Sequence, residues 1–307
     1  MTSVPPAAPP ATVTLARSPA LAPLLARGAL LSPVKRPRPD AAFPRTRLVL
    51  PSLRVDPARL AAYERVCGFP PAGASGTSGG GVLPLTYPHV LGFPAAMRLM
   101  SGRGFPLPLL GLVHTSLEIT RHRAVPAAGT HGLSVHVEGL APHRRGTEAT
   151  VVTVLRSPGG DPVWESRSTY LARHRTPAPS SGAGAGPSAP RPEEEPATAR
   201  PLPVVDAWLL AEDTGRRYGA ASGDRNPIHL HPLAARLFGF PRAVAHGMWT
   251  VARCLAAHGV PEAVAVRADF RAPVLLPGTV TFGARDGRFE LRGPGDRLHL
   301  TGEVRPV

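Results

Sequence analysis

The chain has 307 residues and a formal net charge of +14 at pH 7, with 43% hydrophobic residues, 39 prolines and 32 glycines. This length allows two domains that each bury a core, and the proline and glycine content indicates many loops. No apolar run approaches the roughly 18 residues that a membrane-spanning helix needs, so we expect no membrane span.

The positive charge does not by itself indicate a nucleic-acid-binding protein. Lys35 is the only lysine among 35 basic residues, and no arginine cluster with interleaved aromatic residues appears. A mild positive field would suit a phosphate-bearing substrate. Cys67 and Cys254 lack metal or redox spacing, which predicts reduced structural cysteines in a cytoplasmic protein.

Two segments of biased composition divide the chain. Residues 1–46 are rich in proline and alanine without sustained periodicity, so we expect a disordered or loosely packed N-terminal extension. Residues 175–200 predict a disordered linker, because they combine a Pro/Ser/Gly/Ala run with three consecutive glutamates. The remaining blocks, residues 47–174 and 201–307, are each the size of one small domain.

The first block contains one apolar helical stretch, residues 87–100, after a Gly/Ser-rich region at residues 73–81 that has no acid. Alternating residues predict strands over 133–138, 150–155 and 164–171. This block therefore predicts one helix followed by several strands.

The second block begins with a short helix from Asp213 and Thr214 through Tyr218, which Gly223 would end. A short helix over residues 232–238 and a longer one over 247–257 follow, and the longer helix is apolar nearly all round, which predicts that it is buried. Four short strand candidates come next, at residues 264–270, 280–284, 289–292 and 298–304.

Between the first two of these helices lies the string Ser222-Gly-Asp-Arg-Asn-Pro-Ile-His229. Asp224 and His229 cannot share one continuous helix, because Pro227 removes a backbone donor and pushes Asn226 away from helical angles. The string therefore predicts a shaped loop that presents a carboxylate and an imidazole together, as general acid–base chemistry requires. His246-Gly247-Met248 follows at the start of the buried helix.

The string Ser-Gly-Asp-x-Asn-Pro-x-His, followed by His-Gly-Met, resembles the signature of the MaoC-like, R-specific enoyl hydratase (hydratase 2) family. The resemblance implies an α+β double hotdog, two antiparallel sheets each wrapped around a central helix and paired as a pseudo-dimer. It also implies a hydro-lyase that reversibly dehydrates (3R)-3-hydroxyacyl thioesters, or hydrates trans-2-enoyl thioesters, in fatty-acid metabolism. The substrate would be carried by coenzyme A or acyl carrier protein, and no metal or redox cofactor is implied.

The resemblance also implies roles for individual residues. Asp224 and His229 would hold and activate the catalytic water, or receive the leaving hydroxyl. Gly247 is the expected oxyanion donor, because its N–H lies at the start of the buried helix. Asn226 would shape the loop, and Ser222 belongs to the same substrate-binding or loop-shaping group.

Two further histidines lie beside these residues. His246 is expected to be structural at the helix start, with substrate contact as the alternative. His231 departs from the family, which commonly places an aspartate there as a helix cap. Because histidine caps poorly, we expect the helix at residue 232 to be less fixed. The histidines show no zinc pattern.

The two blocks echo each other, which indicates an internal duplication. Residues 87–100 stand where 246–257 stand in the second block, and residues 123–130 resemble 271–279. The first block lacks the Asp-x-Asn-Pro-x-His string, so we expect it to cover the acyl chain without reacting. Three apolar residues of its helix would line the tunnel that holds the acyl chain or would simply form core, namely Leu91, Phe93 and Met97.

Other functions fit part of this pattern. A hotdog thioesterase would not need the Asn-Pro-x-His loop, and a non-catalytic acyl-thioester-binding protein could keep it by descent. Asp224 could instead satisfy backbone donors of a turn, and His229 could be merely packed. Arg242 could meet a phosphate or be solvated. A homodimer is a further expectation.

Overall fold

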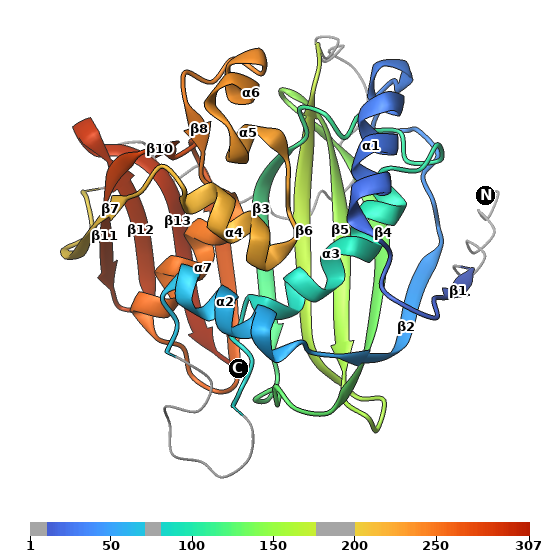
Figure 1. The fold of residues 1–307 in the computed structure, drawn as a ribbon, viewed down its shortest axis with the longest axis horizontal. Coiled ribbons are helices and arrows are strands. Elements are labelled where there is room, and N and C mark those ends of the chain that lie inside the picture. The colour runs from blue at the N-terminus through green and yellow to red at the C-terminus, as the bar shows by residue number, and fades with distance from the viewer. Residues whose placement is uncertain (1–10, 71–80, 176–199) are drawn as a thin grey trace, which may run out of the picture.

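The computed structural model describes residues 11–70, 81–175 and 200–307. Its main feature is one 11-stranded sheet, ordered β1-β2-β4-β5-β6-β3-β9-β13-β12-β11-β7 (Figure 1). Every neighbouring pair is antiparallel except β1 (Thr12–Thr14) with β2. The expected Gly/Ser-rich loop at 73–81 and the expected linker at 175–200 lie almost wholly outside the described residues.

The sheet consists of two halves with the same internal order. The first half contributes β2 (Arg47–Arg54), β3 (Val113–Arg121), β4 (Thr130–His143), β5 (Gly146–Arg156) and β6 (Pro162–Arg173). The second contributes β7 (Val204–Leu210), β9 (Val264–Phe270), β11 (Gly278–Arg285), β12 (Arg288–Gly293) and β13 (Arg297–Pro306). In each half the strand that comes second in the chain, β3 or β9, lies at the centre of the sheet. This shared order supports the duplication inferred from sequence.

The two halves meet where β3 pairs with β9, in a register that runs from Ser116 opposite Asp269 to Arg121 opposite Val264. Side chains reinforce this seam. Arg267 pairs with Glu118 across it at 2.6 Å, and Arg121 donates to the carbonyl oxygen of Glu262 at 2.8 Å. The backbone ladder of the sheet therefore runs unbroken from one half into the other.

Each half carries one long buried helix, α3 (Tyr87–Met100) in the first and α7 (Gly247–His258) in the second, on the same side of the sheet (Figure 1). A further helix, α2 (Pro57–Cys67), joins the halves on that side, because Trp249 Nε1 donates to the carbonyl oxygen of Val66 at 2.8 Å. One central helix per antiparallel half is the layout expected for a double hotdog.

The first half departs from the sequence expectations mainly at its N-terminus. Residues 21–31 form a helix, α1 (Leu21–Leu31), followed by a 3-10 turn at Ser32–Val34. The expectation of a disordered or loosely packed extension is wrong for this part, because Leu21, Leu24 and Leu25 recur at helical spacing and pack against the core. Gly28 is buried beside Leu109, which holds α1 close to the chain that follows α3.

The second half matches the expected elements closely. The first helix is α4 (Thr214–Ser222), longer than expected, and it ends at Gly223 with a left-handed φ of 84°. The next elements are α5 (Pro227–Leu230), α6 (Pro232–Leu237) and a small two-stranded sheet of β8 (Ala243–Val244) and β10 (Leu275–Leu276). Among the described residues, no helix is long and apolar enough to cross a membrane.

Candidate active site

Three successive side-chain-to-backbone hydrogen bonds build the loop between α4 and α5. Ser222 Oγ accepts from the N–H of Asp224 at 3.1 Å, Asp224 Oδ1 from that of Asn226 at 3.2 Å, and Asn226 Oδ1 from that of Ile228 at 3.4 Å. Each bond spans two residues, the geometry in which Ser, Asp and Asn stabilise turns. The loop is therefore fixed while the second carboxylate oxygen of Asp224 stays available.

His229 lies on the one-turn helix α5, which Pro227 begins and Asn226 caps. Its Nδ1 lies 2.7 Å from the carbonyl oxygen of Val244. A carbonyl can only accept, so Nδ1 carries the hydrogen of the neutral ring and Nε2 keeps its lone pair. His229 is thereby prepared to take a proton at Nε2.

His246 holds both members of the pair in place. Its Nε2 donates to the backbone carbonyl oxygen of Asp224 at 2.9 Å, and its ring stacks on that of His229 with centroids 3.8 Å apart. Nε2 is also 4.0 Å from Asp224 Oδ2. His246 is only 2% exposed, against 28% for the Asp224 side chain, which favours the structural role over substrate contact.

Burial keeps both imidazoles neutral near pH 7. It lowers the pKa of His229 below the ordinary 6.5, although the carboxylate of Asp224 opposes this shift. Burial, together with the charge of His229, moves the pKa of His246 well below its ordinary range. The resting site therefore contains one carboxylate and a neutral histidine with a free lone pair, which suits a general base.

We expect a pH–rate profile with an acid limb below the ordinary histidine range. Protonated His229 has no lone pair, so kcat/KM should be full near neutral pH and fall only as the pH drops through the lowered pKa of His229. The measurement is initial rates from pH 4 to 9, with each sample returned to pH 7.5 to separate titration from unfolding. An acid limb centred above 7 would contradict this assignment.

Gly247 begins α7, and its N–H is one of the first amides of the helix, which have no acceptor within it. The positive end of the helix dipole lies at the same place. A Cβ at this position would lie 2.9 Å from Cε1 of Phe270, so only glycine allows that ring to approach. The N–H can therefore serve a developing oxyanion.

Side chains of the first half pack toward this site, where His114 of β3 contacts Phe270 of β9 in the second half. The Phe270 ring lies 4.7 Å from that of His114 on β3, which in turn stacks on Tyr170 of β6 at 4.6 Å and on His89 of α3 at 6.1 Å. Burial lowers the pKa of His89 to about 4, and the charge of Asp224 acts against that shift. The first half thus places His89 within electrostatic reach of the candidate acid–base pair.

Sequence reasoning did not find His114, Tyr170 or Phe270, because strands distant along the chain bring them together. His89 lies within the helix predicted at residues 87–100, but nothing in the sequence indicated its place near the site. His231 caps α6 despite the expectation that histidine caps poorly: its Nδ1 accepts from the N–H of Leu233 at 3.2 Å. Arg242 donates to the carbonyl oxygen of Pro277 at 2.8 Å.

Asp224, His229 and His246 also lie as close together as the ligands of a metal ion, with one candidate atom from each within 4.8 Å of the others. The hydrogen-bond pattern does not suit a metal. The Nε2 hydrogen of His246 points at the Asp224 carbonyl, so that nitrogen offers no lone pair to the group. The donor set therefore fits acid–base chemistry better than metal binding.

Comparison with known proteins agrees with this geometry. Residues 187–288 match the model of the MaoC-like domain. The chain is 37% identical over 253 residues to 3-hydroxyacyl-thioester dehydratase X of Mycobacterium tuberculosis, covering 82% of this chain and 84% of that protein.

Solved structures give the same result for the fold. The crystal structure of HtdX from M. tuberculosis superposes with a TM-score of 0.70 and 34% identity, covering 85% of this chain and 100% of that one. Another M. tuberculosis protein, described as a double hotdog, superposes with a TM-score of 0.52 at 14% identity, over 84% of this chain and 95% of that one. The expected double hotdog is thus confirmed, and the chain belongs to the MaoC-like dehydratase family.

Proposed function

We propose that the protein is a hydro-lyase that dehydrates (3R)-3-hydroxyacyl thioesters and hydrates trans-2-enoyl thioesters in fatty-acid metabolism. The observation that carries this proposal is the tautomer of His229. Its Nδ1–H is fixed on Val244, so Nε2 keeps its lone pair, and the ring lies close to the Asp224 carboxylate and stacks on His246, the N-cap of α7. The M. tuberculosis relative is named a 3-hydroxyacyl-thioester dehydratase, which supports the same substrate class.

In the hydration direction, a water bound between Asp224 and His229 gives a proton to the pair as its oxygen attacks C3 of the enoyl thioester. The electron pair of the double bond moves to the thioester oxygen, where the Gly247 N–H stabilises the charge. The pair then returns the proton to C2, so it ends in its starting protonation state. Dehydration follows the same steps in reverse.

The first half would complete this site without reacting. Its described residues contain no Asp-x-Asn-Pro-x-His string, and its His114 contacts Phe270 at the seam. We propose that the two halves act as a pseudo-dimer and that α3 covers the acyl chain, with Leu91, Phe93 and Met97 lining or backing the tunnel. The carrier would be coenzyme A or acyl carrier protein. We also propose that the protein forms a homodimer and that it is cytoplasmic.

The test is incubation with crotonyl-CoA, followed at the absorbance band of the enoyl thioester and with a thiol reagent. A hydratase bleaches the band and releases no thiol. Thiol release would instead indicate a thioesterase, and neither signal would indicate a binding protein. Either of these two outcomes, repeated with crotonyl acyl carrier protein, would overturn the proposal.

A further inference from the structure

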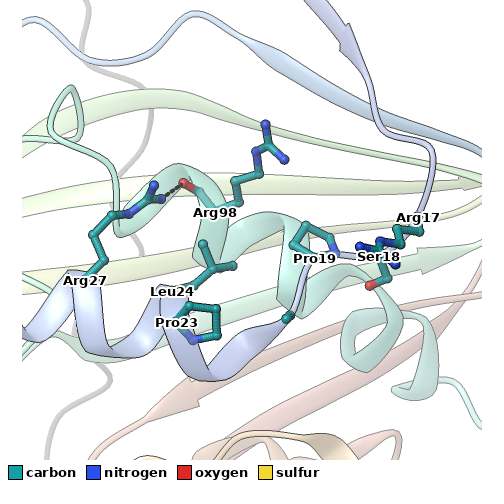
Figure 2. Close-up of a pocket in the computed structure, with 8 residues that line it drawn as sticks. Arg17, Ser18, Pro19, Pro23, Leu24, Arg27 and Arg98 are labelled. Atoms are coloured by element: carbon teal, nitrogen blue, oxygen red, sulfur yellow. Dashed lines mark hydrogen bonds between the residues drawn. The ribbon is translucent and has the colours of Figure 1, made fainter.

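A hollow of about 620 Å³ lies between α1, the segment that precedes it and α3 (Figure 2). Three arginines line it, namely Arg17 before α1, Arg27 on α1 and Arg98 on α3. Ser18 adds a hydroxyl, and the remaining lining residues are proline, alanine and leucine. We call this site the arginine hollow.

The arginine hollow has an unbalanced positive charge. No acid lines it, and none of its three arginines forms an ion pair within the part of the chain that the structure describes. Lys35 lies close enough to Arg27 that burial and the arginine charge together lower its pKa to about 8. Cations gathered without a counter-charge repel one another, and a bound anion removes that cost.

Arg27 is held in a defined orientation rather than free in solvent. Its Nη2 donates to the carbonyl oxygen of Arg98 at 3.1 Å and to Ser101 Oγ at 2.8 Å (Figure 2 shows the first bond). A guanidinium has five N–H donors, so Arg27 keeps donors beyond those that this nitrogen uses. A fixed, exposed fork of this kind suits the paired oxygens of a phosphate.

The helix that lines the arginine hollow, α1, begins beside the loop that carries Asp224. Leu21, the first residue of α1, approaches Gly223 so closely that a Cβ there would lie 2.8 Å from Leu21 Cδ1, and Gly223 directly precedes Asp224. Arg27 lies six residues farther along α1, about 9 Å at 1.5 Å per residue. The arm that carries the thioester in coenzyme A and acyl carrier protein is pantetheine, about as long as four extended residues, roughly 14 Å.

We propose that the arginine hollow binds the phosphate at the end of the pantetheine arm, the group shared by coenzyme A and the acyl carrier protein. This inference rests on the proposed function. The arm would run from the thioester at Asp224 past Leu21, with its phosphate between Arg17, Arg27 and Arg98. The helix in the N-terminal segment is then part of the substrate site.

The test variant is the double charge reversal Arg17→Glu/Arg98→Glu, which spares Arg27 because that side chain also supports the end of α3. The matched control is Arg54→Glu, an exposed arginine of β2 outside the arginine hollow. Hydration is measured with crotonyl-CoA, crotonyl acyl carrier protein and crotonyl-pantetheine, which has no phosphate. The double variant should lower kcat/KM for a phosphate-bearing carrier at least about tenfold through KM, since charge-assisted contacts are lost.

The three substrates make the result decisive. Crotonyl-pantetheine should be used equally well by the wild-type chain and both variants. A loss with only one of the two phosphate-bearing carriers supports the inference and identifies that carrier. An equal loss with all three substrates, or no loss with either carrier, overturns it.

The inference and the proposed function can fail separately. If the wild-type chain hydrates none of the three substrates, the proposed function fails. Calorimetric titration with coenzyme A and with holo acyl carrier protein then decides the inference. Binding that is weakened in Arg17→Glu/Arg98→Glu but not in Arg54→Glu supports it, and unchanged or absent binding overturns it.

Discussion

Asp224→Asn and His229→Asn should each remove nearly all hydratase activity while leaving the fold intact. The amide that replaces the Asp224 carboxylate can still accept from the N–H of Asn226. The amide that replaces the His229 ring can still donate to the Val244 carbonyl, so both anchoring hydrogen bonds survive. What is lost is the proton acceptor in each case. Positioned acid–base groups contribute about 10²–10⁴-fold, which sets the expected fall in kcat.

The double variant should be little worse than either single variant, because the two groups act as one unit on the same water. The measurement is kcat with an enoyl thioester, alongside thermal unfolding of each variant. Asp213→Asn, the same chemical change at an exposed aspartate paired with Arg217, is the control and should keep full activity. Activity in Asp224→Asn within about tenfold of the unchanged chain would show that Asp224 is not part of the catalytic unit.

Gly247→Pro should lower kcat by about 10²–10³-fold relative to Gly247→Ala, the cost of one lost oxyanion donor. Proline is tolerated at the first position of a helix, and it would remove only the N–H of residue 247. His246 already has φ −64° and ψ 135°, the conformation that a following proline requires. The substitution therefore deletes the donor without breaking α7.

Gly247→Ala is the matched control, since it adds the same Cβ against Phe270 and keeps the N–H. Both variants should lose some activity through that contact, and the difference between them measures the donor alone. Single-turnover rates with an enoyl thioester, together with circular dichroism to check helix content, give the comparison. Equal rates in the two variants would place the oxyanion donor elsewhere.

The second half was predictable because its signals are local. Gly and Pro bound its strands, and the β9 range agrees with the expected one. The string from Asp224 to His229 predicted the turn that the structure shows. Some local signals in the first half were missed. Asp56 caps α2 by accepting from the N–H groups of Ala58 and Arg59, and Gly68 ends that helix with a left-handed φ of 78°.

Other features had no local signal to find. Strand β2 contains Pro51, which argues against a strand, and the register shift between Leu50 and Leu53 accommodates it. Helix α1 has no side-chain cap and is stabilised by packing. The contact of His114 with Phe270 requires the halves to be joined first. Motifs therefore predicted the candidate acid–base pair, whereas the residues around it depend on tertiary structure.

Strands β3 and β9 each hydrogen-bond on both sides, so neither half has a free strand edge where they meet. Separated halves would each expose a long, regular edge, which is a template for aggregation. The first half, which lacks the Asp-x-Asn-Pro-x-His string, therefore covers the β9 edge of the second half permanently. A substitution that weakens the pairing of β3 with β9 would expose both edges and lower solubility.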